Sequence, residues 1–234
     1  MSITKKLSML QANPWFEQLP TDITQQMIEL SVSRRYSDGE KIHSKGDEAE
    51  GMLCIVSGVV RASNVSLDGK EAVLTYLEPG SWFGEISLLD GLPRTHDAYA
   101  QGETEILLLP RQRFNQLMEQ RPELYRHFNV LLCQRIRLLF TEINDQALLP
   151  LSQRLIKHLL RLAEAYGKST EQGLRISLKL SQDELALLLS ASRQSINKEL
   201  KKLENANLLI TDSNRLLTLV DVSKLRLLAA GAAD

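Results

Sequence analysis

The spacing of apolar residues changes along the chain and divides it into stretches of different structure. In the first thirty residues Leu7, Leu10, Trp15-Phe16 and Leu19 form one apolar side, and Ile23, Met27 and Leu30 follow at helical spacing. Between residues 35 and 109, short β-type runs are interrupted by turn pairs such as Asp38-Gly39 and Pro79-Gly80. Residues 58–63 and 71–76 flank Asp68-Gly69, a strong hairpin signal. This stretch is predicted to be a compact all-β barrel or sandwich.

After Pro110 the helical period returns, first in a short helix that contains Phe114, Leu117 and Met118. A longer helix is predicted from Pro122 to about Leu148. It carries a narrow seam and an adjacent apolar stripe: Leu132, Ile136, Leu139 and Ile143, and beside them Phe128, Leu131 and Leu138. Two stripes need two partners. We expect one to cover the β domain and the other to pair with a second copy of the chain, although a single wide stripe buried within one chain remains an alternative.

Pro150 ends this helix, because its ring disfavours the α conformation at Leu149 and suits the first turn of a new helix from Leu151 to Tyr166. The predicted domains are therefore a sensor domain over 1–121, a long dimerisation helix with a hinge over 122–149, and a C-terminal domain over 150–234. The predicted fold class is α+β.

The C-terminal domain contains a helix-turn-helix pattern. Ser181-Gln182-Asp183-Glu184 is a capping box that begins one helix, and Ser190-Ala191-Ser192 separates it from a second. Downstream, residues 208–210 and 216–220 flank a polar turn and predict a β-hairpin, which makes the motif winged. A solvated amphipathic helix without a ligand is the plainer alternative for the second helix.

The outward residues of that second helix have the chemistry to read DNA. Arg193 can donate two hydrogen bonds to guanine, Gln194 can pair with adenine, and Asn197 and Lys198 lie one turn further. Ser192, Ser195, Lys201 and Lys202 suit phosphates.

A second constellation lies in the β stretch, from Phe83 to Thr95. Gly84 opens a short helical turn whose backbone N–H groups favour an anion, and Arg94 and Thr95 add donors for a phosphate diester. Glu85 would repel that phosphate, so we expect it to face donors such as a ribose hydroxyl. A structural ion pair between Glu85 and Arg94 beside a tight turn is the alternative.

Composition narrows the function classes. The two cysteines, Cys54 and Cys133, and the four scattered histidines do not form a metal-ligand pattern, and Cys54 is expected to be a buried thiol. No nucleophile–base pair or phosphate-transfer loop is present, so we expect no enzyme. No apolar run reaches the length of a membrane span, and residues 1–7 do not resemble a secretory signal, which together predict a cytosolic protein without a membrane partner. The chain has a net charge of −1, but the part after Pro150 is basic and could meet a polyanion.

In this order the motifs resemble the CRP/FNR family of bacterial transcription regulators over roughly residues 15–222. The resemblance rests on the cassette from Gly84 to Thr95, the long helix, the Pro150 hinge and the winged motif around 192–198. It implies an N-terminal β-roll that senses an effector, a homodimer, and a second helix that enters the major groove of palindromic double-stranded DNA. In the cyclic-AMP-responsive branch, residues that match Gly84, Glu85, Arg94 and Thr95 hold the cyclic phosphate and the ribose. The resemblance also implies, less strongly, that the backbone of Ile86 and Ser87 contacts the nucleotide.

The chain departs from that branch at three places. His96-Asp97 replaces small residues after the Arg-Thr pair, Leu139-Phe140 replaces the threonine and serine that contact the base, and Gln194 replaces a glutamate in the reading helix. The N-terminal cysteine cluster of the oxygen-sensing branch is absent.

These observations lead to a regulator gated by cyclic AMP or another cyclic nucleotide, without a further cofactor. A DNA-binding regulator whose pocket is vestigial or takes another anion is the first alternative, and a winged-helix module that binds protein is the second. An activator would also need a surface for RNA polymerase, for which the polar loop 168–172 is a candidate.

Overall fold

The computed structural model describes residue 10 and residues 13–231, and Leu7 of the predicted N-terminal stripe lies outside them. The contacts divide the chain into two compact units, one up to Arg137 and one from Leu138 onward. The division falls inside the longest helix rather than at Pro150. The three-part division at 121/122 and 149/150 therefore stays a prediction.

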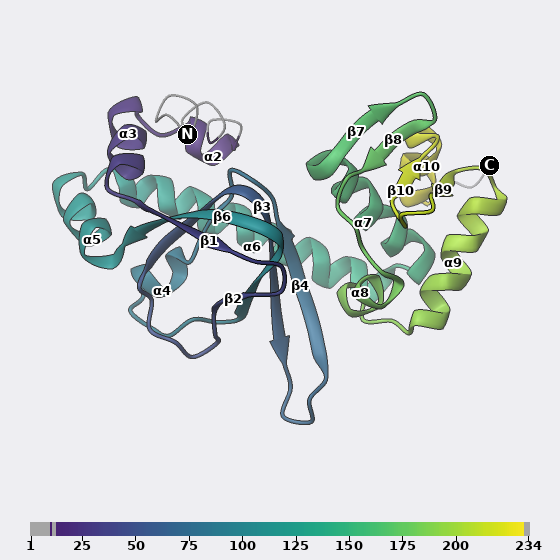
Figure 1. The fold of residues 1–234 in the computed structure, drawn as a ribbon, viewed down its shortest axis with the longest axis horizontal. Coiled ribbons are helices and arrows are strands. Elements are labelled where there is room, and N and C mark those ends of the chain that lie inside the picture. The colour runs from purple at the N-terminus through teal and green to yellow at the C-terminus, as the bar shows by residue number, and fades with distance from the viewer. Residues whose placement is uncertain (1–9, 11–12, 232–234) are drawn as a thin grey trace. The chain divides into compact units, whose positions relative to one another are not determined.

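The first unit is built on a six-stranded antiparallel sheet with the order β1-β6-β3-β4, in which β2 pairs with β6 and β5 with β3 (Figure 1). Its strands are β1 (Val32–Tyr36), β2 (Lys41–His43), β3 (Gly51–Val65), β4 (Glu71–Leu77), β5 (Trp82–Phe83) and β6 (Asp97–Pro110). The predicted hairpin is confirmed, since β3 and β4 pair on either side of Asp68-Gly69. Its strands are longer than the sequence pattern suggested.

The helices of this unit are α2 (Pro14–Glu17), α3 (Thr21–Glu29), α4 (Glu85–Leu89), α5 (Arg111–Gln120) and the first part of α6 (Leu124–Leu148). The predicted short helix is α5, in which Phe114, Leu117 and Met118 are buried. The long helix begins at Leu124 and not at Pro122. Before it the chain makes a tight turn, in which Leu124 N donates to Arg121 O and Tyr125 N to Pro122 O.

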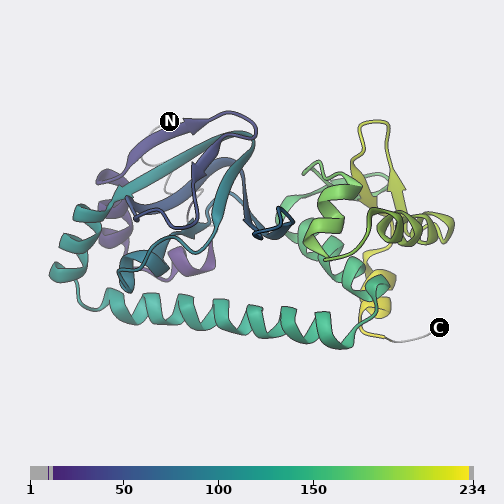
Figure 2. The ribbon, with the colours of Figure 1, turned by 90° about the horizontal axis from the view of Figure 1, so that it is seen from below.

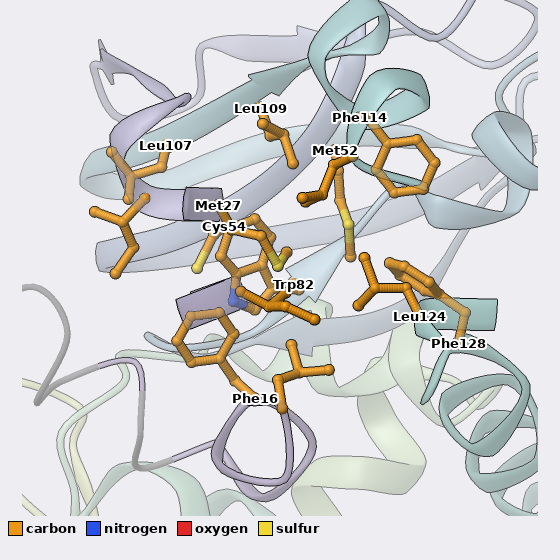
Figure 3. Close-up of a cluster of buried hydrophobic side chains, with 14 of the residues drawn as sticks. Phe16, Met27, Met52, Cys54, Trp82, Leu107, Leu109, Phe114, Leu124 and Phe128 are labelled. Atoms are coloured by element: carbon orange, nitrogen blue, oxygen red, sulfur yellow. The ribbon is translucent and has the colours of Figure 1, made fainter. Parts of the chain in front are cut away.

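Strands β3 and β6 have apolar side chains on both faces, because the sheet carries two cores. Alternate residues Met52, Cys54 and Leu107, Leu109 join the helices in a helix-side core that includes Phe16, Trp82, Phe114 and Phe128 (Figure 3). The intervening residues, among them Leu53 and Ile106, pack with Phe83 on the other face. Cys54 is a buried thiol, as predicted, and burial raises its pKa well above the usual value.

Helix α6 runs without interruption for 25 residues (Figure 2). Phe128 and Leu131 are buried in the helix-side core, as predicted for the stripe that covers the β domain. Leu138 was assigned to the same stripe, and that assignment is wrong: its side chain is 59% exposed. The reason is that Leu138 is the first residue of the second unit, past the end of the sheet-bearing unit.

The second unit joins the end of α6 to helix α7 (Leu151–Tyr166), which begins at the residue predicted from Pro150. A charged cluster connects the two helices across that proline. Asp145 on α6 accepts from Lys157 Nζ at 2.7 Å and Arg161 Nη2 lies 3.7 Å from it, while Glu142 pairs with Arg161 and lies 3.3 Å from His158 Nε2. These contacts join the last turns of α6 to the middle of α7 within one unit.

The remaining elements form a four-stranded sheet of order β7-β8-β10-β9 and three further helices. They are β7 (Gly167–Thr170), β8 (Gly173–Ile176), α8 (Gln182–Leu188), α9 (Arg193–Asn205), β9 (Leu209–Thr211), β10 (Leu217–Leu219) and α10 (Val222–Ala229). The predicted wing is β9–β10. The predicted polar loop 168–172 is wrong in part, because Lys168 to Thr170 belong to β7 and only Glu171 and Gln172 form the turn.

Candidate sensor and DNA-reading sites

The sensor cassette is held by α4 and by the segment that enters β6. Gly84 is the N-cap of α4 and has φ of 88°, a left-handed conformation that favours glycine, and a Cβ there would meet the Arg94 guanidinium. No side chain caps the α4 N-terminus. Ser87 Oγ donates to Pro93 O at 3.1 Å and ties the two halves of the cassette together, while Ile86 is exposed.

Arg94 is 5% exposed, and its guanidinium is anchored to the backbone. Nη1 donates to Gly84 O at 2.9 Å and Nη2 to Gly51 O at 2.7 Å. The Nε atom is buried and has no hydrogen-bond partner among the described residues. Burial lowers the pKa of Arg94, and the charge of Glu85 opposes that shift. A buried guanidinium with an unused donor is a site that an anion would complete.

Glu85 is 0% exposed and pairs with Arg135 on α6, not with Arg94. The alternative of a Glu85–Arg94 structural ion pair is therefore wrong. Arg135 Nη2 also donates to Trp82 O at 2.6 Å, so one arginine fixes both α4 and β5 to the long helix. The second carboxylate oxygen, Oε2, is buried and has no hydrogen-bond partner within the described part of the chain. It remains an acceptor for a hydroxyl, which fits the expectation that Glu85 faces a ribose.

Sequence reasoning missed Arg135. It lies four residues after Leu131 and seven after Phe128, which are the spacings that keep a residue on the buried stripe of a helix. The sequence did contain a signal for this pair, because Arg135 takes the next position of the apolar stripe. An arginine at such a position predicts a buried acidic partner.

Thr95 and its neighbour also differ from the simple expectation. The Thr95 side chain is exposed, and its Oγ1 lies 2.8 Å from His96 Nδ1, so the hydroxyl is hydrogen-bonded to an imidazole. His43, a residue that the sequence pattern did not single out, lies on β2 with its ring 5.8 Å from that of His96. Two imidazoles, one from β2 and one from the residue that follows Thr95, therefore lie beside each other at the end of the cassette.

The candidate DNA-reading residues lie on α9 and at its N-cap. Ser181 and Glu184 make both bonds of the predicted capping box of α8, and Ser190 follows that helix with φ of 50°. Ala191 N donates to Ala186 O across this left-handed residue, which closes the end of α8 and permits the short turn. A serine in this left-handed conformation, which favours glycine, has a small strain cost. Ser192 then caps α9 by accepting from Ser195 N.

The predicted base-reading residues occupy the exposed N-terminal turns of α9. Arg193, Gln194 and Lys198 are exposed. Arg193 Nη1 lies 3.1 Å from Asp183 Oδ2 in a surface pair, and Asn197 Nδ2 donates to Gln182 Oε1 at 3.0 Å. Both contacts are made with α8, and DNA would have to replace the first. Exposed ion pairs contribute little, so that replacement costs little.

Two family models match the chain, a cyclic nucleotide-binding domain over residues 33–121 and a Crp-like helix-turn-helix domain over residues 153–228. A CRP-like cAMP-activated global transcriptional regulator of Mycobacterium tuberculosis is 31% identical over 186 residues, which cover 76% of this chain and 83% of that protein. The chain belongs to the CRP/FNR family of transcription regulators. It is a DNA-binding regulator with a cyclic nucleotide-binding domain.

Other members of the family resemble the chain to a similar extent. The cyclic AMP receptor protein of Thermus thermophilus is 29% identical over 194 residues, which cover 83% of this chain and 87% of that protein. The structure of the c-di-GMP-responsive global regulator CLP of Xanthomonas campestris is similar with a TM-score of 0.72 and 25% identity, over 86% of this chain and all of that one. These relatives respond to different nucleotides, so family membership does not identify the effector.

Within residue 10 and residues 13–231, no group of three or more His, Cys, Asp or Glu is placed to hold a metal ion. No helix in the same part of the chain is long and apolar enough to cross a membrane.

We expect Arg135→Leu to destabilise the sheet-bearing unit by about 3 kcal/mol, because it leaves the buried Glu85 carboxylate without its partner. The value is at the lower end for a buried pair, since Arg135 is partly exposed. Urea unfolding followed by tryptophan fluorescence measures it directly, because Trp15 and Trp82 are the two tryptophans and both are buried in this unit.

Two variants serve as controls. Arg126→Leu removes an exposed arginine from the same helix and should change stability by less than about 0.5 kcal/mol. Adding Glu85→Gln to Arg135→Leu should recover part of the loss. Equal stability of Arg135→Leu and the parent protein would show that the pair does not support the cassette.

Proposed function

We propose that this regulator is a homodimer whose binding to a palindromic operator is controlled by a cyclic nucleotide, with cyclic AMP as the first candidate. The phosphate would be held by Arg94, Thr95 and the backbone of Gly84, Ile86 and Ser87, and the ribose by Glu85. One observation carries the proposal: an unpaired buried donor, Arg94 Nε, and an unpaired buried acceptor, Glu85 Oε2, belong to one cassette. An anionic sugar phosphate satisfies both kinds of atom.

The same observation argues against a vestigial pocket. A pocket that no longer binds a ligand has no reason to retain two buried charged groups with unused hydrogen-bonding atoms, because each costs free energy. The base is a separate question. Leu139 and Phe140 stand where the cyclic-AMP branch has a threonine and a serine. Cyclic GMP and the dinucleotide cyclic di-GMP are therefore compared with cyclic AMP in the test below.

Arg94→Leu tests the assignment of the pocket. We expect it to abolish binding of cyclic AMP in calorimetry and to remove any effect of the nucleotide on operator affinity, because the variant lacks the guanidinium that would pair with the phosphate. Lys70→Leu, which removes a cation from the exposed tip of the β3–β4 hairpin, should bind as the parent protein does. Unchanged nucleotide affinity in Arg94→Leu refutes the pocket.

Dimerisation is supported by the exposed seam of α6. Ile136, Leu139 and Ile143 recur at three and four residues and are 51%, 61% and 61% exposed in the single chain. An apolar stripe of this spacing on a long helix is the surface with which a two-fold coiled coil forms. Two copies would place two α9 helices in successive major grooves, which are about 34 Å apart on one side of the DNA.

We expect the parent protein to have twice the mass of one 26.4 kDa chain in light scattering at micromolar concentration. Ile143→Glu should shift it to the monomer, because two buried carboxylates would meet across the seam. Leu67→Glu introduces the same charge at a fully exposed leucine of the β3–β4 hairpin and should leave the dimer intact. A monomeric parent protein contradicts the proposal.

For DNA, Arg193→Ala should lose about 1–3 kcal/mol of operator affinity per half-site and accept other bases at the guanine that it contacts. Lys201→Ala should weaken binding to all duplexes alike and flatten the dependence of affinity on salt. Selection of bound genomic fragments, followed by titration at several salt concentrations, separates the two effects. If Arg193→Ala keeps full operator selectivity, α9 is not the helix that reads the bases. If DNA affinity does not depend on salt, the winged helix is better explained as a protein-binding module.

The proposed regulator carries out no catalytic step. A regulator that binds chromosomal DNA acts in the cytosol. Contact with RNA polymerase through the β7–β8 hairpin, which an activator would need, remains a prediction.

A further inference from the structure

Two histidines lie beside each other next to the sensor cassette and are not used by the family chemistry proposed above. His43 ends β2 and pairs in register with Ala98 of β6, and His96 immediately precedes β6. The ring centroids of the two imidazoles are 5.8 Å apart, and the His43 ring lies 6.1 Å from that of Phe83. Both rings are partly buried.

Backbone hydrogen bonds hold the two histidines in this arrangement. The loop after His43 is fastened to the segment that carries His96: Gly46 N donates to Arg94 O at 2.9 Å, Arg94 N to Asp47 O at 2.8 Å, and Lys45 N to Asp97 Oδ1 at 2.7 Å. These bonds hold the loop after His43 beside the segment that carries Arg94 and His96.

Burial and the neighbouring positive charges lower the pKa of both imidazoles. Burial, followed by the charges of Arg94 and His96, lowers the pKa of His43 to about 4, although Asp47 and Asp97 oppose the shift. Burial, Arg94 and Arg135 also lower the pKa of His96, against Asp97. The two carboxylates are already engaged: Asp47 accepts from Ser44 N, and Asp97 accepts from Lys45 N and Tyr99 Oη and lies 3.8 Å from Lys41 Nζ.

The two histidines differ in the hydrogen bonding of their Nδ1 atoms. His43 Nδ1 is buried and has no hydrogen-bond partner among the described residues, whereas His96 Nδ1 is bonded to Thr95 Oγ1. Thr95 is itself one of the residues assigned to the phosphate. A phosphate bound there would lie next to the histidine pair through Thr95 as well as through Arg94.

We propose that the sensor takes up a proton on the His43–His96 pair when it binds its anionic effector, so that affinity for the effector rises as pH falls. This inference rests on the proposed function, since it concerns the same pocket. A bound phosphate offsets the repulsion from Arg94 and attracts an imidazolium ion, so it raises the histidine pKa in the complex. Effector binding and protonation then favour each other by the same factor.

The sign and the pH window follow from that linkage. A histidine whose pKa is higher in the complex than in the free protein adds affinity that is fully present below its free-state pKa. That added affinity is lost as pH rises through the pKa of the complex. For His43 the lower limit is about pH 4. One linked proton gives at most about a tenfold change in affinity per pH unit.

The test is calorimetric titration of the full chain with cyclic AMP at pH 5.5, 6.5 and 7.5, repeated at pH 6.5 in two buffers with different ionisation enthalpies. We expect the Kd to fall as pH decreases, by at most about tenfold per unit, and the buffers to report net proton uptake. The double variant His43→Asn, His96→Asn should still bind cyclic AMP but show neither effect. His127→Asn, a change at a histidine on α6 that leaves the cluster intact, should behave as the parent protein does.

Each outcome is decisive. A pH-independent Kd without proton uptake in the parent protein overturns the inference and leaves the nucleotide-gated regulator standing. Retention of the full pH slope by the double variant also overturns it, because the proton then resides elsewhere. Absence of cyclic AMP binding at every pH removes this nucleotide as the effector and the inference with it. The buffer comparison uses only the parent protein, so an absence of proton uptake overturns the inference even where the double variant does not fold.

Discussion

The sensor unit depends on how two buried charged groups, Glu85 and Arg94, are compensated. Removing a carboxylate and a guanidinium from water is costly unless hydrogen bonds replace the lost hydration. Arg135 and two backbone carbonyls, Gly84 O and Gly51 O, supply most of those bonds. The compensation connects α6 with β5, α4 and β3. It is incomplete, because Arg94 Nε and Glu85 Oε2 have no hydrogen-bond partner within the described residues.

This arrangement suggests how the signal can leave the pocket. A ligand that donates a hydrogen bond to Glu85 would change the ion pair between Glu85 and Arg135. Arg135 belongs to helix α6, which continues into the second unit. In that unit the same helix is fastened to α7 by Glu142 and Asp145. A difference in ligand affinity between two states of the dimer would then bias the arrangement of the reading helices. The charged cluster across Pro150 favours a change that carries α6 and α7 together over one that bends between them.

Much of the fold could be predicted because local signals and burial agree. The capping box at Ser181, the turn at Asp68-Gly69 and the start of α7 after Pro150 all act within a few residues, so one sequence contains the whole cause. The β7–β8 hairpin was missed because β7 is an edge strand whose exposed polar residues lack an alternating pattern. Helix α10 was missed as well, although Asp221 caps its N-terminus.

The site was predictable as a set of residues but not as a network. Gly84 and Arg94 could be named from their chemistry, and they do meet in the structure. The partner of Glu85 lies 50 residues away on another element, and the neighbour of His96 lies on β2. Such pairings depend on tertiary contacts that no local pattern contains. For the same reason Leu138 was misplaced, since its spacing matches the buried stripe while the core that would bury it has already ended.

The coupling between the nucleotide pocket and the DNA-reading helices is tested most directly by measuring whether each ligand changes the affinity for the other. Cyclic AMP is titrated into the protein alone and into its complex with a saturating duplex obtained by selection of genomic fragments. The account predicts that DNA tightens nucleotide binding by the same factor by which the nucleotide tightens DNA binding, in the range of about 5- to 150-fold. Equal nucleotide affinity with and without the duplex would show that the sensor and the reading helices are not coupled.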